Sequence, residues 1–263
     1  MVVKIVISGV FGRMGTRIYE LSKSDEEIEV VGAIEREDHP KLNTKLDNNV
    51  VVVSDLRKII ENCDVLIEFT TPGSTLQHLR IAKEYRKSAV VGTTGFNEKE
   101  EEEIKEISQF ISIVKSPNMS LGVNVLLKAI EKIIVPLNEY DIEIIEYHHN
   151  QKKDAPSGTA LRFAEVINNT LKPYGKEKRY IFGRQQGMVG ARSKDEMGIF
   201  AVRAGDIVGE HVILLAGPGE HIEIRHSAHS RDTFAFGSLK AAKWLARNKI
   251  PKGLYSMFDV LGL

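Results

Sequence analysis

The first half of the chain alternates short, almost uninterrupted apolar runs with helical segments, and this alternation constrains the fold more than any other feature. The apolar runs, each expected to form a strand, are residues 2–8, 28–35, 50–54, 64–70, 89–95 and 111–116. The helices expected between them are residues 13–22, 74–87 and 97–108. Strands that are apolar on both faces are typical of a parallel sheet with helices packed on each side. The pattern therefore predicts an α/β fold built on a doubly wound parallel sheet.

From about residue 121 the pattern changes. The strands expected in this part are residues 140–149, 199–206, 207–217 and 220–230. Their apolar and polar positions alternate, which is typical of an antiparallel sheet with one face in water. Helices are expected after residue 121, from Ser157 and at residues 236–248. We predict a second domain of the α+β class, with the last helix packing back on the first domain.

Composition excludes several classes of function. The 36 basic and 36 acidic residues give a formal net charge of +0, which argues against a broad nucleic-acid surface. The single cysteine, Cys63, rules out an intramolecular disulfide and fits a reducing compartment. The start MVVKIVISG reaches glycine too early for a signal-peptide core, and no apolar run is long enough to span a membrane. We expect a cytoplasmic protein that binds neither nucleic acid nor membrane.

The first apolar run leads into SGVFGRMGTR, residues 8–17, where Gly9, Gly12 and Gly15 are spaced G-x-x-G-x-x-G. The usual dinucleotide motif is G-x-G-x-x-G, and Phe11 stands in place of its second glycine. A tight turn between strand and helix still brings backbone N–H groups close to a pyrophosphate. The spacing alone fits a packing turn equally well, so its context has to decide.

That context favours a dinucleotide. Glu35 ends the second apolar run, 20 residues after Gly15 (35 − 15), where an acid binds the adenosine ribose. Arg36 follows it and can pair with a 2′-phosphate. The turns at residues 70–75 and 92–96 follow later strands and lie at the same sheet edge. We predict a site for NADH, NADPH or both.

The stretch EYHHNQKKDAPSGTA, residues 146–160, is crowded with titratable side chains. His148 and His149 are adjacent on an expected strand, so their side chains point to opposite faces and cannot easily bind one ion. No cysteine or carboxylate nearby has the spacing of a zinc site. We therefore expect no metal at this stretch.

The same stretch fits an anion better. A helix is expected to begin at Ser157, and the N-terminus of a helix favours a carboxylate or phosphate. Lys152 and Lys153 add positive charge in front of it. The plain alternative is that Ser157 or Asp154 only caps the helix while both lysines are solvated.

These residues resemble a known family. EYHHNQKKDAPSGTA is similar to the E-x-HH-x-x-K-x-DAPSGTA signature of the 4-hydroxy-tetrahydrodipicolinate reductase (dihydrodipicolinate reductase) family of the diaminopimelate–lysine pathway. GVFGRMG, the Glu35–Arg36 pair, EFTTP, GTTGF, SPNMSLGVN and RAGDIVGEH also look like family segments and occur in family order. The resemblance thus covers essentially the whole chain.

The resemblance implies a role for particular residues. For the cofactor, NADPH or NADH, these are Gly9, Val10, Phe11, Gly12, Arg13 and Met14 at the pyrophosphate, Glu35 at the ribose and Arg36 at a 2′-phosphate. The nicotinamide half would lie along Gly92, Thr93, Thr94, Ser116, Pro117, Asn118 and Met119. His148 would be the proton donor and acceptor and Lys152 a proton donor, while His149, Gly158 and Thr159 would hold the dicarboxylate substrate.

The resemblance also implies an architecture: a Rossmann-like dinucleotide domain, residues 1–119 with 231–263, and a substrate and oligomerisation domain, residues 120–230. A homotetramer assembled through the sheet of the second domain is expected. Thr71 and Met119 differ from residues that some relatives carry along the cofactor path, so preference for NADH or NADPH does not transfer. Two other functions stay open on the residues alone: a non-catalytic dinucleotide sensor, and a dehydrogenase acting on an amino-acid semialdehyde.

Overall fold

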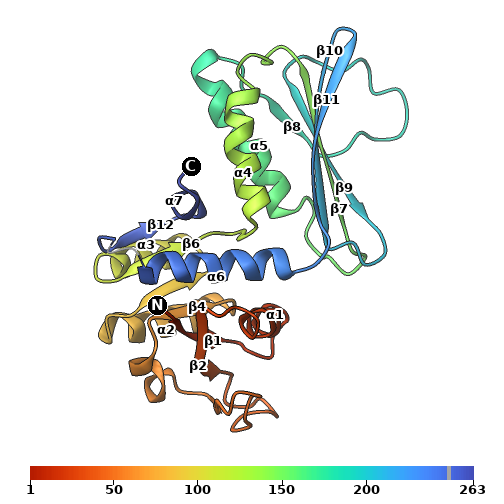
Figure 1. Ribbon diagram of the computed structural model, residues 1–263. Helices are drawn as coiled ribbons and strands as arrows, with labels where there is room; N and C mark the ends of the chain where they lie inside the picture. Colours follow the sequence, from red (N-terminus) through yellow and green to blue (C-terminus); the bar gives the residue numbers. More distant parts are fainter. Residues whose placement is uncertain (248–249) are drawn as a thin grey trace. The chain divides into compact units, whose positions relative to one another are not determined.

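The computed structural model describes residues 1–247 and 250–263. Contacts within the chain divide it into two units, Met1–Leu121 with Arg231–Leu263, and Gly122–Ser230 (Figure 1). In these described ranges, no helix is both long and apolar enough to cross a bilayer.

The first unit is built on a parallel sheet. Its strands, as described, are β1 (Val3–Ser8), β2 (Ile28–Ile34), β3 (Val52–Val53), β4 (Val65–Glu68), β5 (Ser88–Val91), β6 (Ser112–Lys115) and β12 (Gly253–Tyr255). They lie in the order β12-β6-β5-β4-β1-β2-β3, and every neighbouring pair is parallel. The strands β2 and β3 lie on one side of β1, and the later strands β4, β5 and β6 lie on its other side. This reversal confirms the predicted Rossmann-like doubly wound sheet, in which ligands bind at the carboxyl ends of the strands beside the switch.

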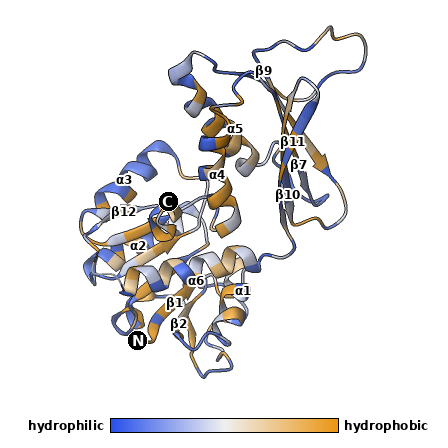
Figure 2. Ribbon diagram, turned by 45° about the horizontal axis from the view of Figure 1, so that its top comes forward, coloured by the Kyte–Doolittle hydropathy of each residue, from blue (hydrophilic) through white to orange (hydrophobic). Residues whose placement is uncertain are grey.

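Helices cover both faces of this sheet. They are α1 (Arg13–Ser22), α2 (Pro72–Glu84), α3 (Glu98–Ser108), α6 (Asp232–Arg247) and α7 (Met257–Leu261), with 3₁₀ turns η1 (Leu56–Lys58) and η2 (Ile60–Asn62). One apolar cluster joins α1, α6 and α7 to the sheet, and a second joins α2 and α3 to its other face. In Figure 2 the strands of this sheet are mostly orange and α3 is mostly blue, as expected for buried strands beneath a solvated helix.

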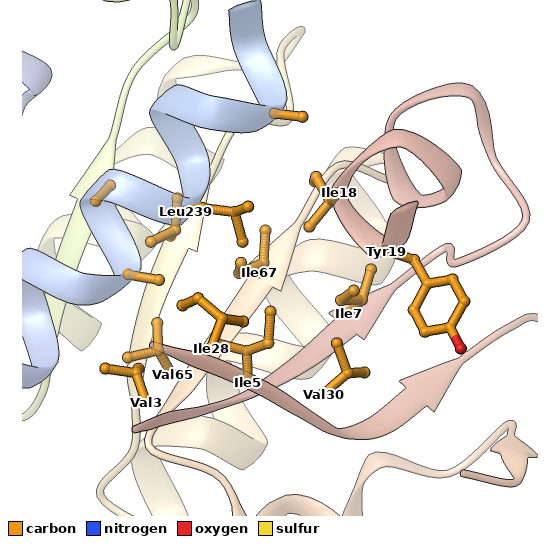
Figure 3. Packing of buried hydrophobic residues seen from close by; sticks show 14 of the residues in the cluster. Val3, Ile5, Ile7, Ile18, Tyr19, Ile28, Val30, Val65, Ile67 and Leu239 are labelled. Carbon is orange, nitrogen blue, oxygen red and sulfur yellow. The ribbon is translucent and has the colours of Figure 1, made fainter. Parts of the chain in front are cut away.

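The helix α6 comes from the C-terminal part of the chain and packs beside α1. Figure 3 shows Leu239 of α6 among the sheet residues Val65 and Ile67, with Ile18 of α1 on the same face. The guanidinium of Arg17 donates to Asp232 over 2.6 Å and ties the two helices together. We predicted this helix over residues 236–248; residue 248 lies outside the described residues.

The second unit has a mixed sheet. Its strands are β7 (Asp141–His148), β8 (Arg179–Ile181), β9 (Glu196–Arg203), β10 (Gly209–Gly217) and β11 (Glu220–Ala228), in the order β11-β10-β7-β9-β8. The other elements are α4 (Leu121–Ile133), which begins at the end of the first unit, α5 (Gly158–Leu171) and the 3₁₀ turn η3 (Lys172–Tyr174). β10 is antiparallel to β11 and β7, whereas β9 is parallel to β7 and β8. The prediction of an antiparallel sheet was therefore wrong for β9, because the segment between β7 and β9, which includes α5 and β8, returns the chain to the end of the sheet where β7 began.

One face of this second sheet is covered by α5. Phe163 and Ile167 of α5 are fully buried, as are Ile142 and Ile144 of β7. Because side chains alternate along a strand, Glu146 and His148 follow Ile144 on this same face. The sequence therefore directs two titratable side chains toward the covered side of the sheet, next to the start of α5.

Candidate functional site

The glycine-rich turn joins β1 to α1 and is shaped by positions that cannot carry a side chain. Gly9 has φ = +65°, a left-handed conformation that favours glycine. A Cβ atom on Gly15 would lie 2.0 Å from the carbonyl oxygen of Gly9. Gly12 is the N-cap residue of α1 and has no side chain to cap the helix. The turn therefore brings the backbone close to whatever anion lies at the start of α1.

Replacing Gly15 with alanine tests this turn. We expect a loss of at least about 2 kcal/mol in the free energy of unfolding, because the new methyl group overlaps backbone that has to move. The matched control is Gly73→Ala near the start of α2, where a Cβ atom meets nothing within 4 Å. That variant should be neutral or gain up to ~1 kcal/mol. Urea unfolding measures both, and equal stability of the two variants would contradict the close packing of the turn.

Glu35 connects the end of β2 to this turn. Its carboxylate accepts a hydrogen bond from the backbone N–H of Phe11 over 2.9 Å and from that of Arg36 over 3.3 Å. An ionised carboxylate has about four acceptor positions, so ribose hydroxyls can still bind to it. Arg36 forms a 3.0 Å pair with Asp38, and both side chains are mostly exposed. Such a pair contributes little stability, so the guanidinium can pair with another anion instead.

Phe11 fits where a glycine was expected because its ring points away from the turn. The ring stacks on His39 with 5.1 Å between centroids, and the ammonium of Lys41 lies 5.0 Å from its centre. Val10 points the other way and is buried in the core beneath the turn. Arg13 is exposed and Met14 half-buried at the first turn of α1.

The turn after β5 contains one buried and one exposed threonine. Thr93 is buried and its hydroxyl accepts from the backbone N–H of Thr70 over 3.0 Å, whereas Thr94 is exposed. Gly92 lies against the ring of Phe69, and a Cβ atom there would be 2.1 Å from it. Any contact that Thr93 makes with a ligand must therefore come from its backbone.

The crossover at residues 116–119 is similar. The Ser116 hydroxyl donates to the carbonyl oxygen of Asn118 over 2.8 Å, which folds the segment on itself. Met119 is 1% exposed and belongs to the core of the first unit, and its carbonyl lies where a Cβ atom on Gly237 would be. Pro117 is exposed. Ser116 and Met119 can thus shape a cofactor site, but their side chains are already used within the fold.

In the second unit, the fully buried carboxylate of Glu146 is the centre of a polar cluster. One oxygen lies 2.5 Å from Nδ1 of His148, and the other accepts from the backbone N–H of Ser157 over 3.0 Å. Arg203 donates to both oxygens, each over 2.8 Å. Burial alone would raise the pKa of Glu146, but the hydrogen bonds from His148 and Arg203 outweigh it and lower the pKa to about 2. Glu146 is therefore a permanent negative charge at neutral pH.

This charge fixes the orientation of His148. Because Nδ1 faces an ionised carboxylate, it carries the proton, and Nε2 is the nitrogen left for a reacting group. Nε2 would lie 3.0 Å from a Cβ atom on Gly209, so a larger residue at that position would press on the ring. The His148 side chain is 12% exposed. His149 follows the end of β7 and is half-buried.

Lys152 joins the cluster through Asp154 and Arg203. Its Nζ lies 2.8 Å from both carboxylate oxygens of Asp154, whose pKa is lowered by that hydrogen bond. Arg203 also donates to the backbone carbonyl of Asp154 over 2.7 Å. Lys152 is 19% exposed at its side chain, but Asp154 is 63% exposed. Lys153, by contrast, is exposed, as the solvated alternative predicted.

The start of α5 completes the cluster. Ser157 is its N-cap, and the hydroxyl accepts from the backbone N–H of Ala160 over 3.2 Å. The capping interpretation is therefore right for Ser157, while Asp154 pairs with Lys152 instead. Gly158 is exposed and has nothing within 4 Å of where its Cβ atom would be. Thr159 is half-buried in the first turn.

Three residues of this cluster were missed by the sequence analysis: Glu146, Arg203 and His211. Glu146 could have been found from its position two residues before His148 on the same strand, because that spacing places both side chains on one face. His211 on β10 is buried, and its Nε2 lies 3.0 Å from the Ser157 hydroxyl. Burial and the neighbouring His148 and His226 lower the pKa of His211 to about 3, so it is neutral.

Within the described residues, no group of three or more His, Cys, Asp or Glu side chains is arranged to hold a metal ion. The cluster around Glu146 pairs its carboxylate with donors instead. It therefore offers groups for proton transfer and for anion binding.

Comparisons with known proteins cover both units. A family domain described as the N-terminus of dihydrodipicolinate reductase matches residues 3–119, and one described as its C-terminus matches residues 122–261. The 4-hydroxy-tetrahydrodipicolinate reductase of Geobacter sp. (strain M21) is 44% identical over 270 residues, 99% of each chain. That of Aquifex aeolicus (strain VF5) is 43% identical over 277 residues, 100% of each chain. A solved dihydrodipicolinate reductase from Paenisporosarcina sp. TG-14, with dipicolinate bound, is 26% identical with a TM-score of 0.80, over 98% of this chain and 99% of that one.

Proposed function

The chain belongs to the dihydrodipicolinate reductase family, and on that premise we propose that His148 and Lys152 supply the proton that completes the reaction. That reaction is the NAD(P)H-dependent reduction of 4-hydroxy-tetrahydrodipicolinate to tetrahydrodipicolinate, a step of diaminopimelate and lysine biosynthesis. The main support for the assignment of residues is the buried carboxylate of Glu146, which contacts His148, Arg203 and the start of α5.

The first unit has the features that a dinucleotide requires. The turn at residues 9–14 is packed so closely that a Cβ atom on Gly15 would overlap its backbone. The backbone of this turn would hold the pyrophosphate. Glu35 would bind the adenosine ribose, and residues 92–94 and 116–119 would lie along the nicotinamide half. When bound, the cofactor supplies the hydride. Because Glu35 and the exposed Arg36 lie side by side, we propose that both NADH and NADPH bind.

The second unit would hold the two carboxylates of the substrate. The start of α5 at Gly158 and Thr159 favours a negative charge, and Lys152 adds a positive one. The contact of Lys152 with the mostly exposed Asp154 is a weak pair, so a substrate carboxylate can replace Asp154 as its partner. His149 would contact the substrate from the end of β7. Cationic groups at this position also stabilise the charge that builds up as hydride arrives.

The proton would then come from His148 or Lys152. The 4-hydroxyl of the substrate leaves as water, which gives a conjugated C=C/C=N ring; this ring accepts hydride at carbon and afterwards needs one proton. Glu146 holds the Nδ1 proton of His148, so Nε2 can give up or take a proton while the ring stays in place. The same carboxylate holds the ring in one orientation, as an aspartate does for the histidine of a hydrolase triad.

The variant Gly158→Ala tests whether the start of α5 binds a carboxylate of the substrate. Gly158→Ala should leave the free energy of unfolding within about 1 kcal/mol of wild type, because the position is open and helical. We expect the KM for the dicarboxylate to rise roughly tenfold, since the methyl group crowds the helix start. The KM for NADH should be unchanged. An unaltered substrate KM would place the carboxylates elsewhere.

The experiment that tests the function itself is a coupled assay with freshly made substrate and either NADH or NADPH. Turnover with either cofactor, and competition by pyridine-2,6-dicarboxylate, is the expected result. A stable cofactor complex without turnover would point to a dinucleotide sensor instead. If neither NADH nor NADPH were oxidised, the assignment of this activity to the protein would be wrong.

We also propose that the protein is a homotetramer that assembles through the second sheet. The face of that sheet opposite α5 carries Ile145, Phe200, Val202 and Leu214, all only partly buried in the single chain. Such an apolar face is typical of a contact with another subunit. Analytical ultracentrifugation should give four times the mass of the 29.4 kDa chain, and a monomer would contradict the proposal.

A further inference from the structure

A second buried polar network, in the first unit, plays no part in the chemistry described so far. Glu68 is the last residue of β4 and is fully buried. Its Oε1 lies 2.7 Å from Nδ1 of His78 on α2, and that nitrogen is also 3.2 Å from the hydroxyl of Ser8 at the end of β1. The network therefore begins directly before the glycine-rich turn.

The other oxygen of Glu68 continues the network toward β5. It accepts a hydrogen bond from the Thr70 hydroxyl over 2.9 Å, and that hydroxyl lies 3.2 Å from the hydroxyl of Thr75. Thr75 contacts the Thr93 hydroxyl over 2.9 Å, and Thr93 accepts from the backbone N–H of Thr70. These contacts join the turns that follow β1, β4 and β5, three adjacent strands.

Stability alone does not explain such a network. Moving a carboxylate and an imidazole out of water costs free energy, and well-packed apolar residues often serve as well or better at such positions. Burial would lower the pKa of His78, but the hydrogen bond and charge of Glu68 outweigh it and raise the pKa. The pair is thus directional and is connected to turns rather than to the apolar core.

We propose that Ser8, Glu68, Thr70, Thr75, His78 and Thr93 form a positioning network that is anchored on the end of β1 and holds the turns after β4 and β5 in the arrangement needed by the nicotinamide half of the cofactor. The inference rests on the proposed function, because it takes the dinucleotide to lie at these strand ends. The hydrogen bond from the Thr70 backbone N–H to the Thr93 hydroxyl joins the two turns directionally, whereas apolar packing would let them shift. The adenosine half, beyond β2, lies on the side of β1 away from β4 and should depend little on the network.

The test is the double variant Glu68→Met/His78→Leu, which removes the carboxylate and the imidazole together and so leaves neither without its partner. We expect its unfolding midpoint to stay within about 5 °C of wild type. Its affinity for NADH, measured by nicotinamide fluorescence, should fall roughly tenfold because the turns lose their alignment. Its affinity for adenosine diphosphate, measured by calorimetry, should stay within about twofold. A parallel loss of both affinities, or no loss of NADH affinity, would overturn the proposal.

A milder pair of variants decides the question if the double variant does not fold. Thr70→Val keeps the shape but removes the hydroxyl, and it should show the same selective loss of NADH affinity, while Thr70→Ser restores it. Glu103→Gln on α3, which breaks the surface pair with Arg80 of α2, is the control and should bind both ligands as wild type does. Wild-type protein that binds no NADH would reject the proposed function and the network's role together. Wild-type binding with an unaffected Thr70→Val would reject the network alone.

Discussion

Replacing His148 with alanine is expected to lower kcat roughly 10²- to 10⁴-fold, the usual contribution of a positioned proton donor. Lys152→Ala should lower kcat over the same range, because it removes both a proton donor and the cation beside the substrate. Neither change touches the glycine-rich turn, so the KM for NADH should stay within about twofold of wild type. Steady-state kinetics with each substrate varied in turn measures both effects.

Two histidines of the same unit serve as controls for these variants. His149→Ala should raise the KM for the dicarboxylate more than it lowers kcat, because we assign it to binding rather than proton transfer. His221→Ala, an exposed position on β11, should behave as wild type. If the His148 and Lys152 variants both kept near-wild-type turnover, the assignment of the proton to this cluster would be wrong.

The sequence predicted the first 119 residues well because apolar runs alternate there with clearly helical segments. The helix expected at residues 13–22 is α1 with the same bounds. The predicted bounds of the strands before and after it differ from the observed ones by one residue at one end. β8, β12 and α7 were not predicted, since strands of three residues and a helix of five are too short to establish a period. The direction of β9 was also beyond the pattern, because a strand with one covered face alternates in the same way whether it is parallel or antiparallel.

The candidate site was predictable where its residues are close in sequence. His148, Lys152 and the helix start lie within one short stretch, and local rules place them on a strand end, a turn and a cap. Glu146 shares that stretch, but its importance depends on Arg203, which is 57 residues away and meets it only through the pairing of β7 with β9. The burial of the Thr93 side chain could not be predicted for the same reason, because its hydrogen-bond partner Thr70 lies at the end of another strand.

Glu146→Gln is expected to affect catalysis and stability together. The amide keeps the shape of the side chain but removes the charge that fixes the Nδ1 proton of His148, so we expect kcat to fall roughly 10- to 100-fold. It also leaves the Arg203 guanidinium without its anion, which should cost about 3 kcal/mol in the free energy of unfolding at pH 7. Urea unfolding and steady-state kinetics on the same preparation measure the two effects.

The stability difference between wild type and Glu146→Gln should depend on pH in one direction only. The pKa of Glu146 is lowered from 4.5 to about 2 in the folded protein, so its contribution is complete above about pH 4.5 and disappears as the pH falls toward 2. The two unfolding curves should therefore converge between those values. Glu165→Gln, which breaks an exposed pair with Arg162 on α5, should show neither the loss of kcat nor the convergence. A Glu146→Gln enzyme with wild-type kcat would mean that His148 needs no charged partner, and a stability difference that persisted at pH 2 would mean that shape, not charge, makes Glu146 stabilising.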